Sequence, residues 1–112
     1  MRRLLCAVGL LMLTVACGGT PVHDAPLEAA DLAGASGREL VISGWYGPCD
    51  DVLEPEVSET DTEVRVRVPV RRFGEACAAV VERRTTTVTL QQPLGDRPVV
   101  DARTHERLPG RR

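Results

Sequence analysis

Four valines at alternate positions between residues 63 and 71 constrain the fold of this chain more than any other feature. The valines are Val64, Val66, Val68 and Val70, and they alternate with Glu63, Arg65, Arg67 and Pro69. A period of two places every valine on the same face of a β-strand, whereas helical spacing would scatter them around the axis. The segment therefore predicts a strand with one buried face and one solvated face. Because proline has no N–H group, we expect this strand to lie at a sheet edge or to end at Pro69.

Other short segments rich in β-branched residues predict further strands. They cover residues 38–46, 84–91 and 98–102, with 57–62 as the end of a partner strand and a turn. Residues 76–82 fit either a strand or a helical turn. Five or six short strands separated by turns are typical of an all-β domain. We expect a small antiparallel β-sandwich, and an immunoglobulin-like arrangement is one form that this pattern allows.

The first sixteen residues have the pattern of an export signal. Arg2 and Arg3 precede thirteen uncharged residues, 4–16. That apolar run is shorter than the roughly 20 residues that span a bilayer, and it is followed by small and polar residues. Residues 1–16 are therefore predicted to be a signal peptide rather than part of the fold.

The end of this segment resembles a bacterial lipobox, in which an apolar residue and two small ones precede a cysteine. The run here is Leu13-Thr14-Val15-Ala16-Cys17, and Thr14 stands where that family usually has leucine. The resemblance implies that Cys17 is modified with a thioether-linked lipid and acylated, for example with palmitate. It also implies cleavage before Cys17 and attachment to the outer face of a membrane. The alternative is ordinary signal-peptide cleavage after Ala16, which would give a freely secreted domain.

The cysteine count favours lipidation of Cys17. The chain has Cys6, Cys17, Cys49 and Cys77, of which Cys6 leaves with the signal peptide. If Cys17 carries a lipid, two cysteines remain for an oxidising compartment, and we predict that Cys49 and Cys77 form a disulfide bond. The chain-entropy model gives such a loop of about 29 residues roughly 3.5 kcal/mol of stabilisation.

Composition predicts a spacer and a domain in the rest of the chain and argues against nucleic acid as a partner. Residues 17–37 are rich in Gly, Ala, Pro and Asp without apolar alternation, which predicts a flexible, lipid-anchored spacer before a domain at 38–112. Removing residues 1–16 leaves 12 arginines and 16 acidic residues, a net charge of −4. A mildly acidic surface argues against a nucleic-acid partner.

Few residues suggest chemistry. Residues 50–63 carry seven acids, and we expect them to face the arginines of residues 64–84 across an antiparallel pair; a Ca²⁺ site is the alternative. No spacing indicates a nucleophile beside a base, so we expect no enzyme, catalytic residue, metal or cofactor. Trp45 and Tyr46 point to opposite faces of their strand, so one belongs to the core and the other is a candidate binding surface. The alternative, which we favour, is that both are half-buried packing residues near the predicted disulfide bond.

The C-terminal stretch adds a second resemblance. Residues 93–109, PLGDRPVVDARTHERLP, resemble the last segment of small exported proteins and lipoproteins of high-GC Gram-positive bacteria. That resemblance implies a place in the cell envelope and no particular activity. We expect Arg97 and Asp101, four residues apart, to pair or to cap the turn. The sequence predicts a membrane-anchored, non-catalytic binding module for an envelope protein or polymer. The alternatives are a freely secreted inhibitor-like domain and an accessory module of an envelope enzyme.

Overall fold

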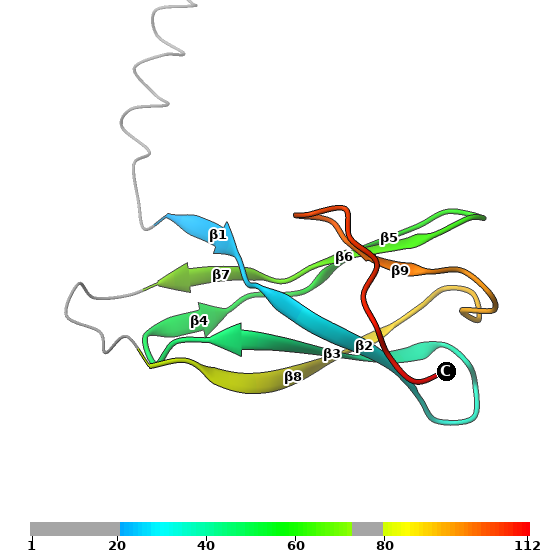
Figure 1. Cartoon of the computed structure of the whole chain (residues 1–112), viewed down its shortest axis with the longest axis horizontal. Coiled ribbons are helices and arrows are strands. Elements are labelled where there is room, and N and C mark those ends of the chain that lie inside the picture. Colours follow the sequence, from blue (N-terminus) through cyan, green and yellow to red (C-terminus); the bar gives the residue numbers. More distant parts are fainter. Residues whose placement is uncertain (1–20, 73–79) are drawn as a thin grey trace, which may run out of the picture.

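The described part of the chain is all-β. The computed structural model describes residues 21–72 and 80–112, which form three small, mostly antiparallel sheets (Figure 1). The strands are β1 (Val22–Asp24), β2 (Leu27–Ala33), β3 (Glu39–Tyr46), β4 (Asp50–Val52), β5 (Glu56–Glu59), β6 (Val64–Arg67), β7 (Pro69–Arg72), β8 (Glu82–Thr89) and β9 (Val99–Asp101). Their order is β1-β7-β4 in the first sheet, β2-β3-β8 in the second and β5-β6-β9 in the third.

The longest strands form the sheet β2-β3-β8. The central strand β3 pairs along its full length with β8, from Glu39 opposite Thr89 to Tyr46 opposite Glu82. Leu40 and Ile42 of β3 are fully buried, and Val88 of β8 lies on the same inner side. The strands predicted at 38–46 and 84–91 are therefore confirmed, with bounds that differ by one or two residues.

The valine-rich segment forms β6 and β7, which follow one another with only Val68 between them. All four valines are buried, as their alternation predicts. Of the two expectations for this strand, the edge position is wrong, because β6 pairs with β5 and β9, and β7 pairs with β1 and β4. The alternative agrees with the break at Val68, since β6 ends at Arg67 and β7 begins at Pro69. Pro69 is tolerated inside the sheets because its missing N–H falls at the break between the two strands. Its carbonyl oxygen still accepts a hydrogen bond from the amide of Leu53, at 2.9 Å.

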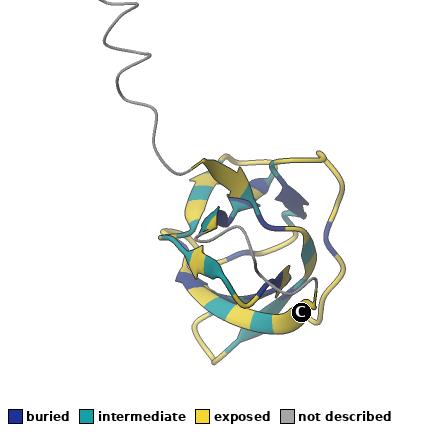
Figure 2. Cartoon of the chain, turned by 90° about the vertical axis from the view of Figure 1, so that its left-hand side faces the viewer, coloured by how far each residue is buried: buried dark blue, intermediate teal, exposed yellow. Residues whose placement is uncertain are grey.

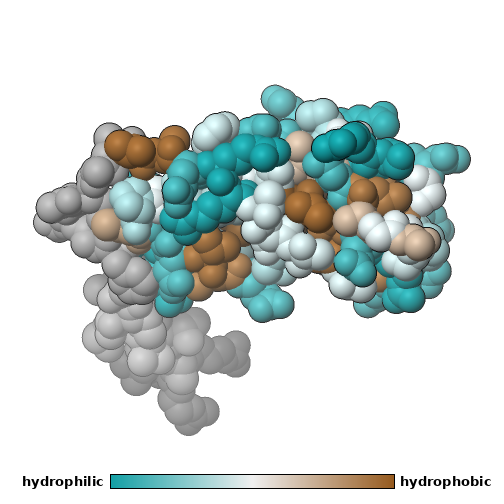
Figure 3. Space-filling view, turned by 90° about the horizontal axis from the view of Figure 1, so that it is seen from below, coloured by the Kyte–Doolittle hydropathy of each residue, from teal (hydrophilic) through white to brown (hydrophobic). Residues whose placement is uncertain are grey.

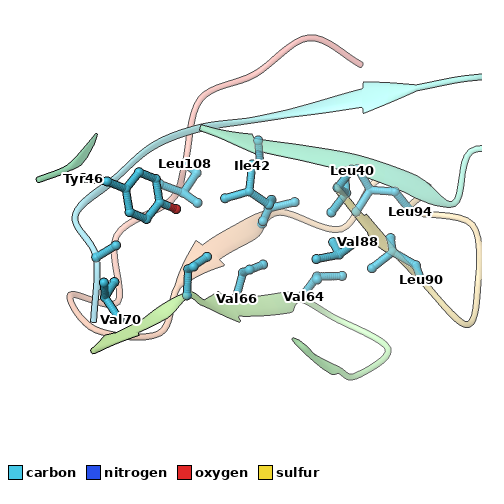
Figure 4. Close-up of a cluster of buried hydrophobic side chains, with 14 residues drawn as sticks. Leu40, Ile42, Tyr46, Val64, Val66, Val70, Val88, Leu90, Leu94 and Leu108 are labelled. Carbon is cyan, nitrogen blue, oxygen red and sulfur yellow. The ribbon is translucent and has the colours of Figure 1, made fainter. Parts of the chain in front are cut away.

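The inner faces of the three sheets share one hydrophobic core. Leu40 and Ile42 face the valines of β6 across this core, and Leu90, Leu94 and Leu108 fill its ends (Figure 4). An end-on view shows the strands surrounding a common interior (Figure 2). The apolar contacts across this interior hold the three sheets together, since burial of apolar surface is the main stabilising effect.

The last residues connect two of the sheets. The amide of Leu108 donates to the carbonyl oxygen of Val99 beside β9, at 2.8 Å. Further on, the carbonyl oxygens of Pro109 and Arg111 accept hydrogen bonds from Ala30 and Leu32 of β2, at 2.9 and 2.8 Å. Residues 109–111 thus extend the sheet beyond β2.

The pairing of β6 with β9 is parallel, which the prediction of a purely antiparallel fold did not include. Val64 lies opposite Val99, and both side chains are fully buried. Parallel neighbours require a long connection rather than a tight turn. Here the connection is the whole stretch from β7 through β8 to residue 98.

The predicted flexible spacer at 17–37 is wrong for its described part. Residues 22–24 form β1 beside β7, and residues 27–33 form β2 beside β3. Ala30 is fully buried, and Leu27 and Leu32 of the same strand pack against the core. Gly34 and Gly37, both at φ +74°, belong to the β2–β3 turn rather than to a linker. Strands are therefore present from residue 22, inside the predicted spacer and before residue 38.

Candidate functional site

A cleft of about 260 Å³ lies at the end of the molecule where β3 ends and β8 begins. The lining residues that the structure describes are His23, Ala25, Pro26, Trp45, Gly47, Asp50, Val70, Arg72 and Val81. They come from β1, β3, β4 and β7 and from the segments that flank them. Strand pairing brings these elements together, because β1 and β4 lie on either side of β7.

Trp45 and Tyr46 take opposite positions at the end of β3. Tyr46 is 1% exposed and lies in the core, whereas Trp45 is 40% exposed beside the cleft. The prediction that one of the two is buried and the other exposed is confirmed, and the alternative of two half-buried residues is wrong for Tyr46. The amide of Trp45 donates to the carbonyl oxygen of Pro26, at 3.0 Å, which fixes this end of β3 against the start of β2.

Exposed apolar side chains lie at the same end of the molecule as this cleft, and Trp45 and Val81 line it. The large hydrophobic residues that are exposed in the described part of the chain are Val22, Trp45, Val80 and Val81, at 46%, 40%, 70% and 55%. We call them the apolar end surface. On the face shown in Figure 3, hydrophobic residues form separate patches among hydrophilic ones, and one patch borders the grey segment at this end. Single exposed apolar residues are common, but a group at one end of a small domain indicates a contact surface.

The charged pair in the cleft is Asp50 and Arg72. The Arg72 Nε lies 3.0 Å from Asp50 Oδ1, and the amide of Gly47 donates to Asp50 Oδ2 at 2.6 Å. Burial of the Asp50 carboxylate, which is 4% exposed, acts to raise its pKa. The hydrogen bonds from Arg72 and Gly47 and the positive charges of Arg72 and His23 outweigh this effect and lower the pKa. Asp50 is therefore held in its ionised form by Arg72 and the amide of Gly47.

Two of the seven acidic residues of 50–63 form ion pairs with arginines across antiparallel strands, which agrees in part with the expectation from the sequence. Besides the Asp50–Arg72 pair, Glu56 of β5 lies opposite Arg67 of β6, with 2.9 Å between Oε1 and Nη1. Asp24 also contacts Arg67, at 2.6 Å. Within residues 21–72 and 80–112, no three His, Cys, Asp or Glu side chains converge on a point that could hold a metal ion.

Only some of the predicted site residues lie in the part of the chain that the structure describes. Cys17 and Cys77 lie outside the described residues, so lipidation and the disulfide bond remain predictions. Cys49 lies in the turn between β3 and β4, where it lines a shallow depression with Pro48, Asp50 and Asp51. Of the candidates that the structure describes, Trp45 is the one that lies on an accessible surface near other exposed apolar residues.

The C-terminal turn differs in part from expectation. Asp101 is buried and caps the turn, because its Oδ1 accepts a hydrogen bond from the amide of Arg103 at 2.8 Å. Arg97 does not pair with Asp101 and instead contacts Glu59. His105 lies in this turn at φ +65° and is exposed.

Sequence reasoning missed two members of the cleft, His23 and Arg72. His23 was assigned to the spacer, where it had no neighbour of known chemistry. Its strand, β1, is three residues long, which is too short for a period of two to be recognised. Arg72 was one of several arginines without an assigned partner, and only the register of β4 against β7 pairs it with Asp50.

Comparisons with known proteins give no further identification. No family model, no curated protein and no solved structure matches this chain. In the described segments of the chain, no helix has the length and apolar character needed to cross a membrane.

Proposed function

We propose that this chain is an exported lipoprotein, anchored to the outer face of the cell membrane through Cys17. Its all-β part would serve as a non-catalytic binding module of the envelope. The observation that carries this proposal is the run Leu13-Thr14-Val15-Ala16-Cys17 after an uncharged segment that begins at residue 4. Several acyl chains on one cysteine anchor a protein stably, whereas one chain gives only marginal binding.

The character of the cleft supports binding over catalysis. Its carboxylate, Asp50, is already engaged by Arg72 and by the amide of Gly47. General acid–base chemistry needs a group that can exchange a proton near neutral pH, and a carboxylate with a lowered pKa is a poor candidate. An exposed tryptophan beside an apolar surface is instead typical of recognition sites.

For the architecture we propose a small β-sandwich. The apolar face of β3, with Leu40 and Ile42, packs opposite the valines of β6, which supports two layers around one core. An immunoglobulin-like topology consists of antiparallel sheets. The parallel pairing of β6 with β9 departs from that topology, so we propose the sandwich without it.

Metabolic labelling with a fatty-acid analogue tests the anchor. In the bacterial source, the wild-type chain and a Cys6→Ser variant should both take up label and sediment with membranes. Cys6 lies inside the signal peptide and serves as the matched control. A Cys17→Ser variant should take up no label. Wild-type protein that is unlabelled and recovered from the medium would overturn the proposal in favour of a freely secreted domain.

A further inference from the structure

We infer that the apolar end surface, Val22, Trp45, Val80 and Val81, rests on the outer leaflet of the membrane to which the chain is anchored. This inference rests on the proposed lipidation of Cys17 and names the surface that the anchor brings to the lipid. The occupant is a phospholipid headgroup region, and the contact is made by side chains rather than by a spanning segment.

The length of the tether is the first argument. Because β1 begins at Val22, only four residues lie between Cys17 and this strand. At about 3.3–3.6 Å per residue, the five steps from Cys17 to Val22 span at most roughly 18 Å. The strand β3 alone, with eight residues, is about 26 Å long at 3.3 Å per residue. A lipid on Cys17 therefore holds the β1 end of the molecule near the bilayer.

The second argument is that the residues at this end suit a membrane interface. Val22 belongs to β1 itself, and Val81 and Trp45 line one cleft with His23 of the same strand. Figure 1 places β1, the end of β3 and the beginning of β8 at the same end of the molecule. Tryptophan is enriched at headgroup level, where its ring tolerates an apolar and a polar neighbour at once. The apolar residues would otherwise be exposed to water.

The charges beside this surface are largely neutralised by one another. Asp50 pairs with Arg72, Glu82 pairs with Arg84 at 2.8 Å, and Glu28 pairs with Arg83 at 3.1 Å. This arrangement presents little net charge to the membrane. Contact through apolar side chains should therefore be independent of anionic lipid and of salt, unlike contact through a basic patch.

The chain offers a direct probe, because Trp45 is its single tryptophan. We would purify the acylated wild-type protein and reconstitute it in phosphatidylcholine vesicles in which some lipids carry a nitroxide near the headgroup. The inference predicts that the nitroxide quenches Trp45 emission. It also predicts that the vesicles protect Trp45 from acrylamide, at low and at high salt.

Two variants make this test specific. In Val81→Asp, the equilibrium between the orientation that contacts the bilayer and the released orientation should shift about tenfold toward release. Burial of a valine side chain contributes at least that factor. Nitroxide quenching should fall accordingly. Ala35→Asp places the same charge on an exposed residue of the β2–β3 turn, at the opposite end, and should leave quenching unchanged. Circular dichroism of both variants checks that the strands are retained.

The outcomes distinguish the anchor from the orientation. If acrylamide quenches Trp45 emission in the acylated protein and the nitroxide does not, the inference is overturned while the proposed function stands. Quenching that needs anionic lipid and disappears at high salt would also overturn it. Protection of Trp45 that increases with protein concentration and not with lipid would assign the surface to a second copy. A mature protein whose mass shows no acyl chain would overturn the inference together with the proposed function.

Discussion

The carboxylate of Glu59 lies 3.3 Å from the guanidinium of Arg97, and both side chains are largely buried, at 14% and 13% exposed. Arg97 also donates to the carbonyl oxygens of Thr60, Leu94 and Pro93, at 3.0, 3.1 and 3.0 Å. A single side chain thus connects the β5–β6 turn to the loop after β8. This contact closes the end of the molecule opposite the cleft.

Replacing Arg97 should cost more stability than replacing any exposed arginine. Arg97→Ala leaves the buried carboxylate of Glu59 and several carbonyl oxygens without their donor, so we expect a loss of about 3 kcal/mol in the free energy of unfolding. Arg103→Ala, at an exposed position, should change it by about 0.5 kcal/mol or less. Urea denaturation followed by circular dichroism measures both values. Equal losses for the two variants would show that the Glu59–Arg97 contact contributes nothing particular.

Stability should fall in acid because two carboxylates are held ionised. Burial acts to raise the pKa of Glu59, but hydrogen bonds from the amides of Gln91 and Gln92 and the contact with Arg97 lower it on balance. The pKa of Asp50 is lowered as well. As the pH falls below about 4, the unfolded chain takes up protons before the folded one does, so the stabilisation is lost.

Urea midpoints measured as a function of pH test this expectation. The wild-type midpoint should be level near neutral pH and decrease as the pH passes below about 4. In Glu59→Gln the neutral-pH midpoint should be lower and the acid decrease smaller, because one of the two groups no longer titrates. An unchanged acid decrease in this variant would mean that Glu59 does not carry the effect.

The buried hydroxyl of Tyr46 has no hydrogen-bond partner among the described residues. Leaving such a group unsatisfied costs about 1–3 kcal/mol, so Tyr46→Phe should keep or increase stability, in contrast to Tyr46→Ala, which should lose about 3–5 kcal/mol.

Burial raises the pKa of Tyr46, an effect that the charge of Arg84 opposes in part. The wild-type protein should therefore lose stability as the pH rises above about 10, and Tyr46→Phe should lack this contribution. Thermal denaturation of the wild type, Tyr46→Phe and Tyr46→Ala measures these differences in stability. A marked loss of stability in Tyr46→Phe would contradict the expectation for the buried hydroxyl.

Gly44 is required where β3 passes close to the start of β2. A β-carbon at this position would lie 3.0 Å from the hydroxyl of Tyr46 and 3.1 Å from the carbonyl oxygen of Pro26. Gly44→Ala should therefore destabilise the protein by about 1–3 kcal/mol through overpacking. Adding Tyr46→Phe removes the nearer contact and should restore part of the loss. Full additivity of the two changes would argue against a direct clash.

The sequence allowed the main strands and the core to be predicted, because their signal is local. The valines of β6 and β7 and the alternating residues of β8 carry their period within one segment. The strands β1 and β2 were missed, since β1 is short and the period of β2 is interrupted by a register shift between Leu27 and Ala29. Their pairing depends on β7 and β3, which are distant in sequence, and no local pattern encodes such partners.

The candidate site was predictable only in part. The alternation along β3 identified Trp45 and Tyr46 and their opposite faces. The other members of the cleft, His23, Asp50 and Arg72, meet because β1 and β4 flank β7. The register of these short pairings depends on the complete fold. The Glu59–Arg97 contact likewise joins residues 38 positions apart, which no local pattern indicates.

Gly110 lies so close to the carbonyl oxygen of Ala30 that any β-carbon there would overlap it. Because glycine has no side chain, the backbone of residues 109–111 can approach and pair with the edge of β2. The amides of this edge would otherwise be available to another polypeptide. A protease that trimmed these residues, or a bulky substitution at Gly110, would uncover a template for strand addition between molecules. Residues 109–111 thus occupy the edge of β2 at which a strand of another molecule could pair.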